Sequence, residues 1–97
     1  MTESINKDEL ITNMTDNLVV LRNKLRLTQD DLAGKIGISR QTLVNIENKR
    51  RDMSWSTFVA LIAVFRAECS TSDLLDHFGI YTKELNRYLV SREITAN

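Results

Sequence analysis

The sequence predicts an all-α domain of five or six short helices, and three observations favour this fold class. There are no prolines and only three glycines among the 97 residues, so few residues interrupt helices. Apolar residues make up 42% of the chain, which argues against a disordered protein. These residues recur at three- and four-residue spacing behind residues that favour helix N-caps. The length suits a single domain, which we place at residues 1–97.

A first helix is predicted by apolar residues on one helical face, Leu18, Leu21 and Leu25. Thr15 or Asp16 is placed to cap it. A weaker apolar pattern within residues 10–14 indicates either an additional helix or an extension before it. We therefore place the core of the domain at about residues 16–79 and an N-terminal extension at residues 1–15.

Two short helices follow, each with its own start and stop signals. Thr28 and Asp31 have the spacing of a capping box. Gly37 is placed to end the helix that they open, because glycine tolerates the left-handed conformation found there. Ser39 provides a second N-cap only two residues later, and its helix covers about residues 40–48. The apolar positions expected to hold the two helices on the core are Leu32, Ala33, Ile36, Ile38, Leu43 and Ile46.

Three further helices are predicted in the second half of the chain. Their expected N-caps are Ser54 or Ser56, then Ser72, then Thr82. Gly79 is placed to end the second of them, and the last helix covers about residues 82–93. Their apolar positions are Phe58, Leu61, Ile62 and Phe65, then Leu74, Leu75 and Phe78, then Leu85, Tyr88 and Leu89.

The charges are unevenly distributed although the net charge is zero. Residues 22–51 contain eight basic and three acidic residues, which gives this segment a net charge of +5. The rest of the chain carries five basic and ten acidic residues, a net charge of −5. A neutral protein with one basic segment can present a face to phosphates, although a charge run can also be a solvated helix surface.

Several classes of function are disfavoured by the sequence. No carboxylate pair beside a histidine and no glycine-rich phosphate loop is present, so we expect no enzyme and no cofactor. The single Cys69 cannot form an internal disulfide, and we expect no metal site. No apolar run approaches the roughly 20 residues that span a bilayer, and the polar N-terminal segment does not resemble a signal peptide. We therefore expect a cytoplasmic protein without membrane contact.

The two short helices joined through Gly37, Ile38 and Ser39 have the order and spacing of a helix-turn-helix. The segments 27–33, 37–43 and 46–48 resemble the phage repressor/Cro (Xre-like) helix-turn-helix DNA-binding family, over roughly residues 18–75. This resemblance implies a compact bundle of five short helices, with the last predicted helix as an addition. The sequence departs from the family in three loops. Arg26 stands where a glycine is usual, no glycine follows Asn48, and no proline precedes the fourth helix.

The resemblance implies that residues 40–48 form a recognition helix that reads the major groove of double-stranded DNA. Arg40, Gln41 and Asn45 are expected to contact bases, because Arg suits guanine while Gln and Asn suit adenine. Val44 is expected either to touch a thymine methyl group or to pack. The alternative for Arg40, Gln41 and Asn45 is that they are ordinary exposed polar residues of an amphipathic helix.

Phosphate contacts are expected around this helix, and the resemblance assigns them to Gln29, Ser39, Asn48, Lys49, Arg50 and Arg51. Thr42 lies between the residues expected to contact bases and is also expected to reach a phosphate. The alternatives are that Ser39 serves only as a cap and that the basic residues form a solvated loop. The resemblance also implies a partly buried ion pair with a structural role between Arg22 and Glu47.

The function that follows is a sequence-specific transcriptional regulator, a repressor, that binds as a homodimer. Tyr81, Leu85, Tyr88 and Leu89 supply more apolar surface than one short helix needs, so we expect them at the dimer interface. The alternative for this helix is that it packs on its own domain. The alternative function is an antitoxin or protein-binding adaptor that reuses the fold and binds a protein partner through the C-terminal helix.

Overall fold

We analysed a computed structural model of the chain, which describes residues 5–90. This part of the chain is all-helical and contains six helices: α1 (Lys7–Lys24), α2 (Gln29–Ile36), α3 (Arg40–Glu47), α4 (Trp55–Arg66), α5 (Cys69–His77) and α6 (Lys83–Val90). The predicted all-α fold with an extra C-terminal helix is confirmed.

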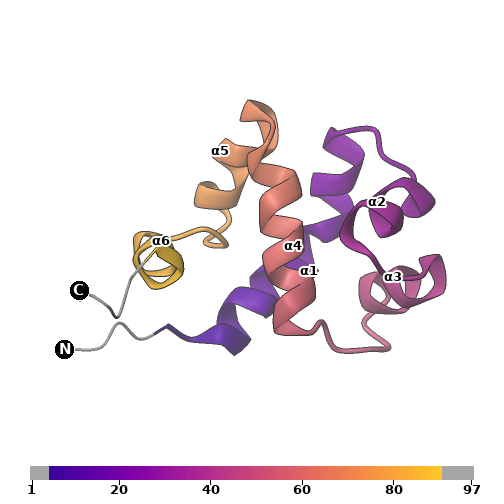
Figure 1. The fold of residues 1–97 in the computed structure, drawn as a ribbon, viewed down its shortest axis with the longest axis horizontal. Helices are drawn as coiled ribbons and strands as arrows, with labels where there is room; N and C mark the ends of the chain where they lie inside the picture. The colour runs from indigo at the N-terminus through magenta and orange to yellow at the C-terminus, as the bar shows by residue number, and fades with distance from the viewer. Residues whose placement is uncertain (1–4, 91–97) are drawn as a thin grey trace.

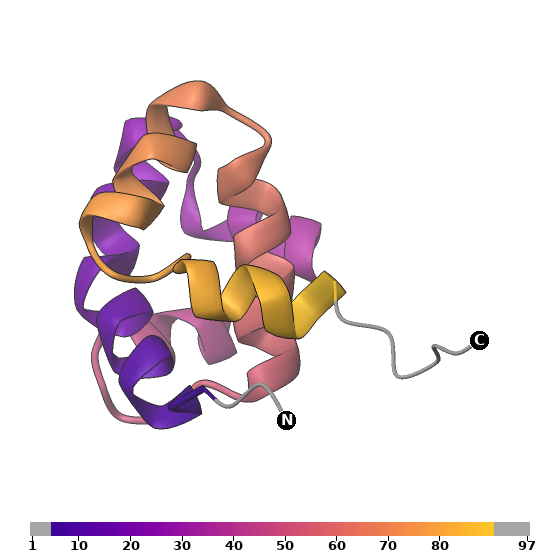
Figure 2. The same ribbon diagram turned by 90° about the vertical axis from the view of Figure 1, so that its left-hand side faces the viewer.

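The helices form a bundle around α1 and α4, which run through the middle of the molecule (Figure 1). The short pair α2 and α3 lies at one end, where α3 contacts α1 and α2 contacts both α3 and α4. At the opposite end α6 crosses the bundle, as the view from that side shows (Figure 2). The longest dimension is 42 Å, and α3 and α6 lie toward opposite ends of it. A partner that contacts α6 would therefore leave α3 accessible.

One continuous core holds these helices together, and every helix contributes to it. The side chains that are fully excluded from solvent include Met14, Leu18, Leu21, Leu32, Leu43, Phe58, Leu61, Phe65, Leu75, Ile80 and Leu85. Burial of a Leu or Phe side chain contributes roughly 1.5–3 kcal/mol relative to leaving it exposed, so this shared core is the main source of stability.

The beginning of α1 differs from the prediction. The helix starts at Lys7 with Asn6 as its N-cap, and Thr15 and Asp16 lie in its interior. Leu10 and Met14 are buried, so they extend the apolar face of the helix toward its N-terminus. The prediction of a cap at Thr15 or Asp16 is therefore wrong, because the core continues past these residues and selects a helix of 18 residues.

The beginning of α5 also differs, whereas its end and the start of α6 were predicted. Ser72 lies inside α5, which begins at Cys69 after an N-cap, Glu68, that makes no side-chain capping bond. Gly79 has a φ of 71° and follows the end of α5. Thr82 opens α6 by accepting a hydrogen bond from the backbone N–H of Leu85 at 3.0 Å. The final part of the predicted helix, residues 91–93, lies outside the described residues.

Candidate nucleic-acid interface

The N-terminus of α2 is fixed by a complete capping box. The Thr28 hydroxyl accepts a hydrogen bond from the Asp31 backbone N–H at 3.0 Å, and the Asp31 carboxylate accepts one from the Thr28 backbone N–H at 3.0 Å. Hydrogen bonding to the ionised carboxylate lowers the pKa of Asp31, chiefly through the backbone N–H of Thr28 and then through the Thr28 hydroxyl. The charge also lies at the positive end of the helix dipole.

The turn between α2 and α3 positions the second helix on the core. Gly37 ends α2 with a φ of 79°, a left-handed conformation that favours glycine. Ser39 then caps α3 by accepting a hydrogen bond from the Thr42 backbone N–H at 3.1 Å. Ala33, Leu43 and Ile46 are buried between the helices. These three apolar side chains fix which face of α3 points outward.

The outward face of α3 carries the four residues predicted to contact bases. Arg40 and Gln41 are exposed, while Val44 and Asn45 are half-buried. The Gln41 side-chain amide donates a hydrogen bond to the Asn45 side-chain oxygen one turn later, at 3.2 Å. Because this bond is exposed, its two amides can exchange it for groups on a ligand.

Gln29 links the outward face of α3 to the interior. Its side-chain nitrogen donates to Glu47 Oε1 at 2.9 Å, and its side-chain oxygen accepts a hydrogen bond from Arg40 at 3.4 Å. One hydrogen of the Gln29 amide remains for another acceptor, because an amide nitrogen carries two. Gln29 therefore connects Arg40 to Glu47.

Arg22 and Glu47 form the ion pair that the family resemblance implies. Arg22 Nε lies 2.8 Å from Glu47 Oε2, and its Nη2 donates to Glu47 Oε1 at 3.2 Å. Its Nη1 donates to the backbone carbonyl of Leu27 at 3.0 Å. The Arg22 and Glu47 side chains are only 13% and 3% exposed. This bidentate pair connects α1, the loop before α2 and the end of α3.

The loop after α3 contains the predicted phosphate contacts Asn48, Lys49, Arg50 and Arg51, which are all exposed. Asn48 caps α3 through its backbone N–H, which donates to Val44 at 2.9 Å. Lys49 points back to α1, where its Nζ lies 2.8 Å from Asp16 Oδ1. Three exposed basic side chains therefore follow the C-terminal end of α3, and one of them is paired with an acid.

The two loops that lack the usual glycine nevertheless keep a glycine-like backbone. Arg26 has a φ of 58° and Lys49 has a φ of 62°, the two non-glycine residues with positive φ among those described. A side chain in this conformation costs roughly 1–2 kcal/mol. At both positions a non-glycine residue thus holds a backbone conformation that glycine adopts without strain.

A family model described as helix-turn-helix matches residues 20–69, which is slightly more than half of the chain. The chain belongs to the helix-turn-helix family of the phage repressor and Cro type. Neither the curated proteins nor the solved structures contain a significant match. Membership makes the helix-turn-helix formed by α2 and α3 a DNA-binding unit.

Outside the helix-turn-helix, α6 packs on its own domain through residues that were predicted at a dimer interface. Leu85 is fully buried in the core. Tyr88 lies edge-on to Trp55, with their ring centroids 6.3 Å apart, and the Lys7 ammonium lies 4.7 Å from the Trp55 ring and 5.5 Å from the Tyr88 ring. Such cation–π contacts stabilise the attachment of α6 to the start of α1 and α4.

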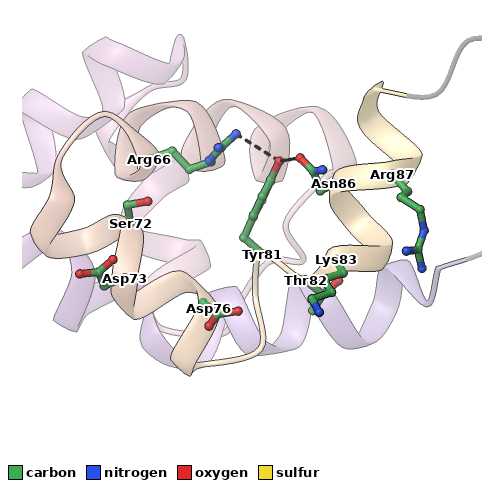
Figure 3. A pocket seen from close by; sticks show the side chains of 9 residues that line it. All are labelled: Arg66, Ser72, Asp73, Asp76, Tyr81, Thr82, Lys83, Asn86 and Arg87. Carbon is green, nitrogen blue, oxygen red and sulfur yellow. Dashed lines mark hydrogen bonds between the residues drawn. The ribbon is translucent and has the colours of Figure 1, made fainter.

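Tyr81 makes a second set of contacts beside a pocket between α5 and α6 (Figure 3). Its hydroxyl accepts a hydrogen bond from Arg66 at 3.1 Å and donates one to the side chain of Asn86. The Arg66 guanidinium also lies 4.2 Å from the Tyr81 ring centroid.

The prediction for the dimer residues therefore needs a correction. Leu85 offers no surface to a partner, and Tyr81 and Tyr88 are largely engaged within the chain. The sequence could not show this, because it does not reveal that Trp55 and Arg66 face α6. Leu89 remains 38% exposed, and Val90, which was not predicted, is 63% exposed.

The described residues contain neither a metal-binding cluster nor a membrane-spanning helix. Between residues 5 and 90 no group of three His, Cys, Asp or Glu side chains is arranged to hold a metal ion. Within the same range, no helix is both long and apolar enough to span a membrane.

Proposed function

We propose that this protein is a sequence-specific regulator of transcription that represses by occupying its operator, with residues 40–48 in the major groove. The observation that carries this proposal is the outward face of α3. This face bears an arginine and two amide side chains. The opposite face packs in the core through Leu43 and Ile46. A rigid helix with side chains suited to base edges is what direct readout requires.

Each residue of the outward face suits a particular base. The Arg40 guanidinium matches the two acceptors of guanine, and the Gln41 and Asn45 amides match adenine. The bond between Gln41 and Asn45 orients both amides before binding. Val44 is half-exposed, and its side chain suits a thymine methyl group.

The polar residues around α3 suit phosphates. The Thr42 hydroxyl accepts a hydrogen bond from Ser39 at 2.8 Å, so its own hydrogen remains available to a phosphate oxygen. Gln29 offers its second amide hydrogen at the start of α2, where the helix dipole also favours an anion. Asn48, Arg50 and Arg51 extend this surface beyond the end of α3.

A homodimer is the form that we propose for binding, since one recognition helix reads only about four or five base pairs. Leu89 and Val90, at the end of α6, are the apolar side chains left for a partner there. Because α6 lies far from α3 along a 42 Å axis, a dimer through α6 favours half-sites about two helical turns apart. Half-sites about one turn apart would indicate an interface closer to α3.

The same exposed residues support a second candidate function. An antitoxin or adaptor would bind a protein partner through Leu89 and Val90 while α3 remains available to DNA at the other end of the molecule. Binding of a protein other than a second copy, abolished by Leu89→Asp but not by Gln41→Ala, would favour this function.

The test is selection of bound duplexes from a random pool with the wild type and with Gln41→Ala. The wild type should enrich an inverted repeat, and Gln41→Ala should lose preference at one base of each half-site, by about 1–3 kcal/mol. Asn86→Ala removes a side-chain amide from α6 and serves as the control that should enrich the wild-type site. A reporter that carries the enriched site beside its promoter should then be repressed by the wild type and less so by Gln41→Ala.

Two results would contradict the proposal. Failure of the wild type to enrich any sequence would indicate that the helix-turn-helix is a scaffold for protein contacts. Enrichment that is identical for the wild type and Gln41→Ala would mean that α3 does not read the site.

A further inference from the structure

The basic loop after α3 shares a surface hollow with two acidic residues. Lys49 and Arg51 line this hollow together with Asp16 from α1 and with Asp52. Arg50 is not among the residues that line it. The run of three basic residues is therefore uniform in sequence but not in its surroundings, because two of the three lie beside carboxylates.

Lys49 has the closest contact with an acid. Its ammonium nitrogen lies 2.8 Å from Asp16 Oδ1, and the two side chains are 64% and 49% exposed. Exposed pairs of this kind contribute little to stability, typically less than about 1 kcal/mol. A phosphate can therefore replace the carboxylate with little effect on the fold.

The backbone holds Lys49 in place for this contact. Lys49 has a left-handed backbone conformation, with a φ of 62°. Its backbone N–H donates a hydrogen bond to the carbonyl of Ile46 at 3.0 Å. Lys49 is thus anchored at the end of the recognition helix while its side chain reaches α1.

We infer that Asp16 competes with DNA phosphate for Lys49 and thereby limits the affinity of the protein for DNA. This inference rests on the proposed function. On binding, Lys49 either leaves Asp16 for a phosphate or remains paired and adds no attraction. In both cases Asp16 reduces the attraction that Lys49 can offer to a phosphate.

The experiment compares the full-length wild type with Asp16→Asn on a selected site and on an unrelated duplex, at several salt concentrations. Asp16→Asn should bind both duplexes about three- to ten-fold more tightly at 0.1 M salt, with a salt dependence steeper by about one unit in log–log slope. The effect should be equal for both duplexes because phosphates carry no sequence information. Asp76→Asn makes the same charge change on α5 and should have a much smaller effect.

A second pair of variants tests whether the effect passes through Lys49. In a Lys49→Gln background, Asp16→Asn should give less than half of its original gain in affinity. Circular dichroism of each variant checks that it is folded, which the exposure of both side chains leads us to expect.

Three results would overturn the inference: unchanged affinity in Asp16→Asn, an equal gain in Asp76→Asn, or an undiminished gain in the Lys49→Gln background. These results leave the proposed function intact as long as the wild type binds its selected site. If the wild type binds no duplex at all, the proposed function fails, and this inference fails with it.

Discussion

Two ion pairs join the end of α3 to α1, and they have the same length but different surroundings. Arg22 and Glu47 approach to 2.8 Å, as do Lys49 and Asp16. The first pair is almost fully buried and has further hydrogen bonds to Leu27 and Gln29. The second pair is about half exposed.

The two pairs have different roles because their burial differs, although their lengths are the same. A buried charge that loses its partner cannot recover its lost hydration, so the Arg22–Glu47 pair fixes the position of α3. Water compensates readily for the loss of an exposed partner, so Lys49 can exchange Asp16 for another anion. The buried pair therefore belongs to the fold, and the exposed pair belongs to the surface that we propose for DNA binding.

The largest expected effect is that of Glu47→Gln. It keeps the shape of the side chain but leaves Arg22 without a counter-charge, which should lower the free energy of unfolding by about 3 kcal/mol. Asp16→Asn makes the same carboxylate-to-amide change in the exposed pair and should lower it by less than about 1 kcal/mol. Urea unfolding of both variants measures the difference, and equal losses would contradict the distinction between the two pairs.

A smaller effect, of opposite sign, is expected for Arg26→Gly. Glycine relieves the left-handed strain at φ 58° but loses more backbone entropy on folding, so the net stabilisation should be about 0.5–1 kcal/mol. Lys24→Gly exchanges a basic residue for glycine at the last residue of α1, where the conformation is helical, and should be destabilising by up to about 1 kcal/mol. Thermal unfolding of the two variants compares them, and a loss of stability in Arg26→Gly would show that its side chain stabilises the loop.

The smallest effect is a pH dependence at the start of α2. Because the folded pKa of Asp31 lies below its ordinary value of 3.8, this group stabilises the folded state above that pH. The stabilisation is lost as the pH falls from 3.8 toward the lowered folded pKa. Asp31→Asn should therefore lose less stability than the wild type on acidification below about pH 4. Unfolding in urea across this range, with Asp30→Asn as the control, measures the change, and parallel curves for Asp31→Asn and the wild type would contradict it.

The helix-turn-helix was largely predictable because its signals are local. The capping box at Thr28 and Asp31, the turn at Gly37 and the cap at Ser39 each depend on residues within three or four positions. The outward face of α3 follows from its period, once Leu43 and Ile46 are assigned to the core. The Arg22–Glu47 pair was predicted only through the family resemblance, since 25 residues separate its members.

Other features were decided by contacts that the local pattern does not contain. Thr15 and Ser72 resemble caps but lie inside helices, because packing selects where a helix begins. The involvement of Asp16 was missed as well, although the absence of a glycine at Lys49 marked that loop as unusual.

The helical class, the family and the outward face of α3 follow from the sequence alone, because they depend on short-range hydrogen bonds and on the period of the helix. Tertiary packing places Leu85 and Tyr88 of α6, and Tyr81 just before it, against their own domain, and it brings Lys49 to Asp16. These contacts join segments far apart in the chain, and they form only when the core brings whole helices together.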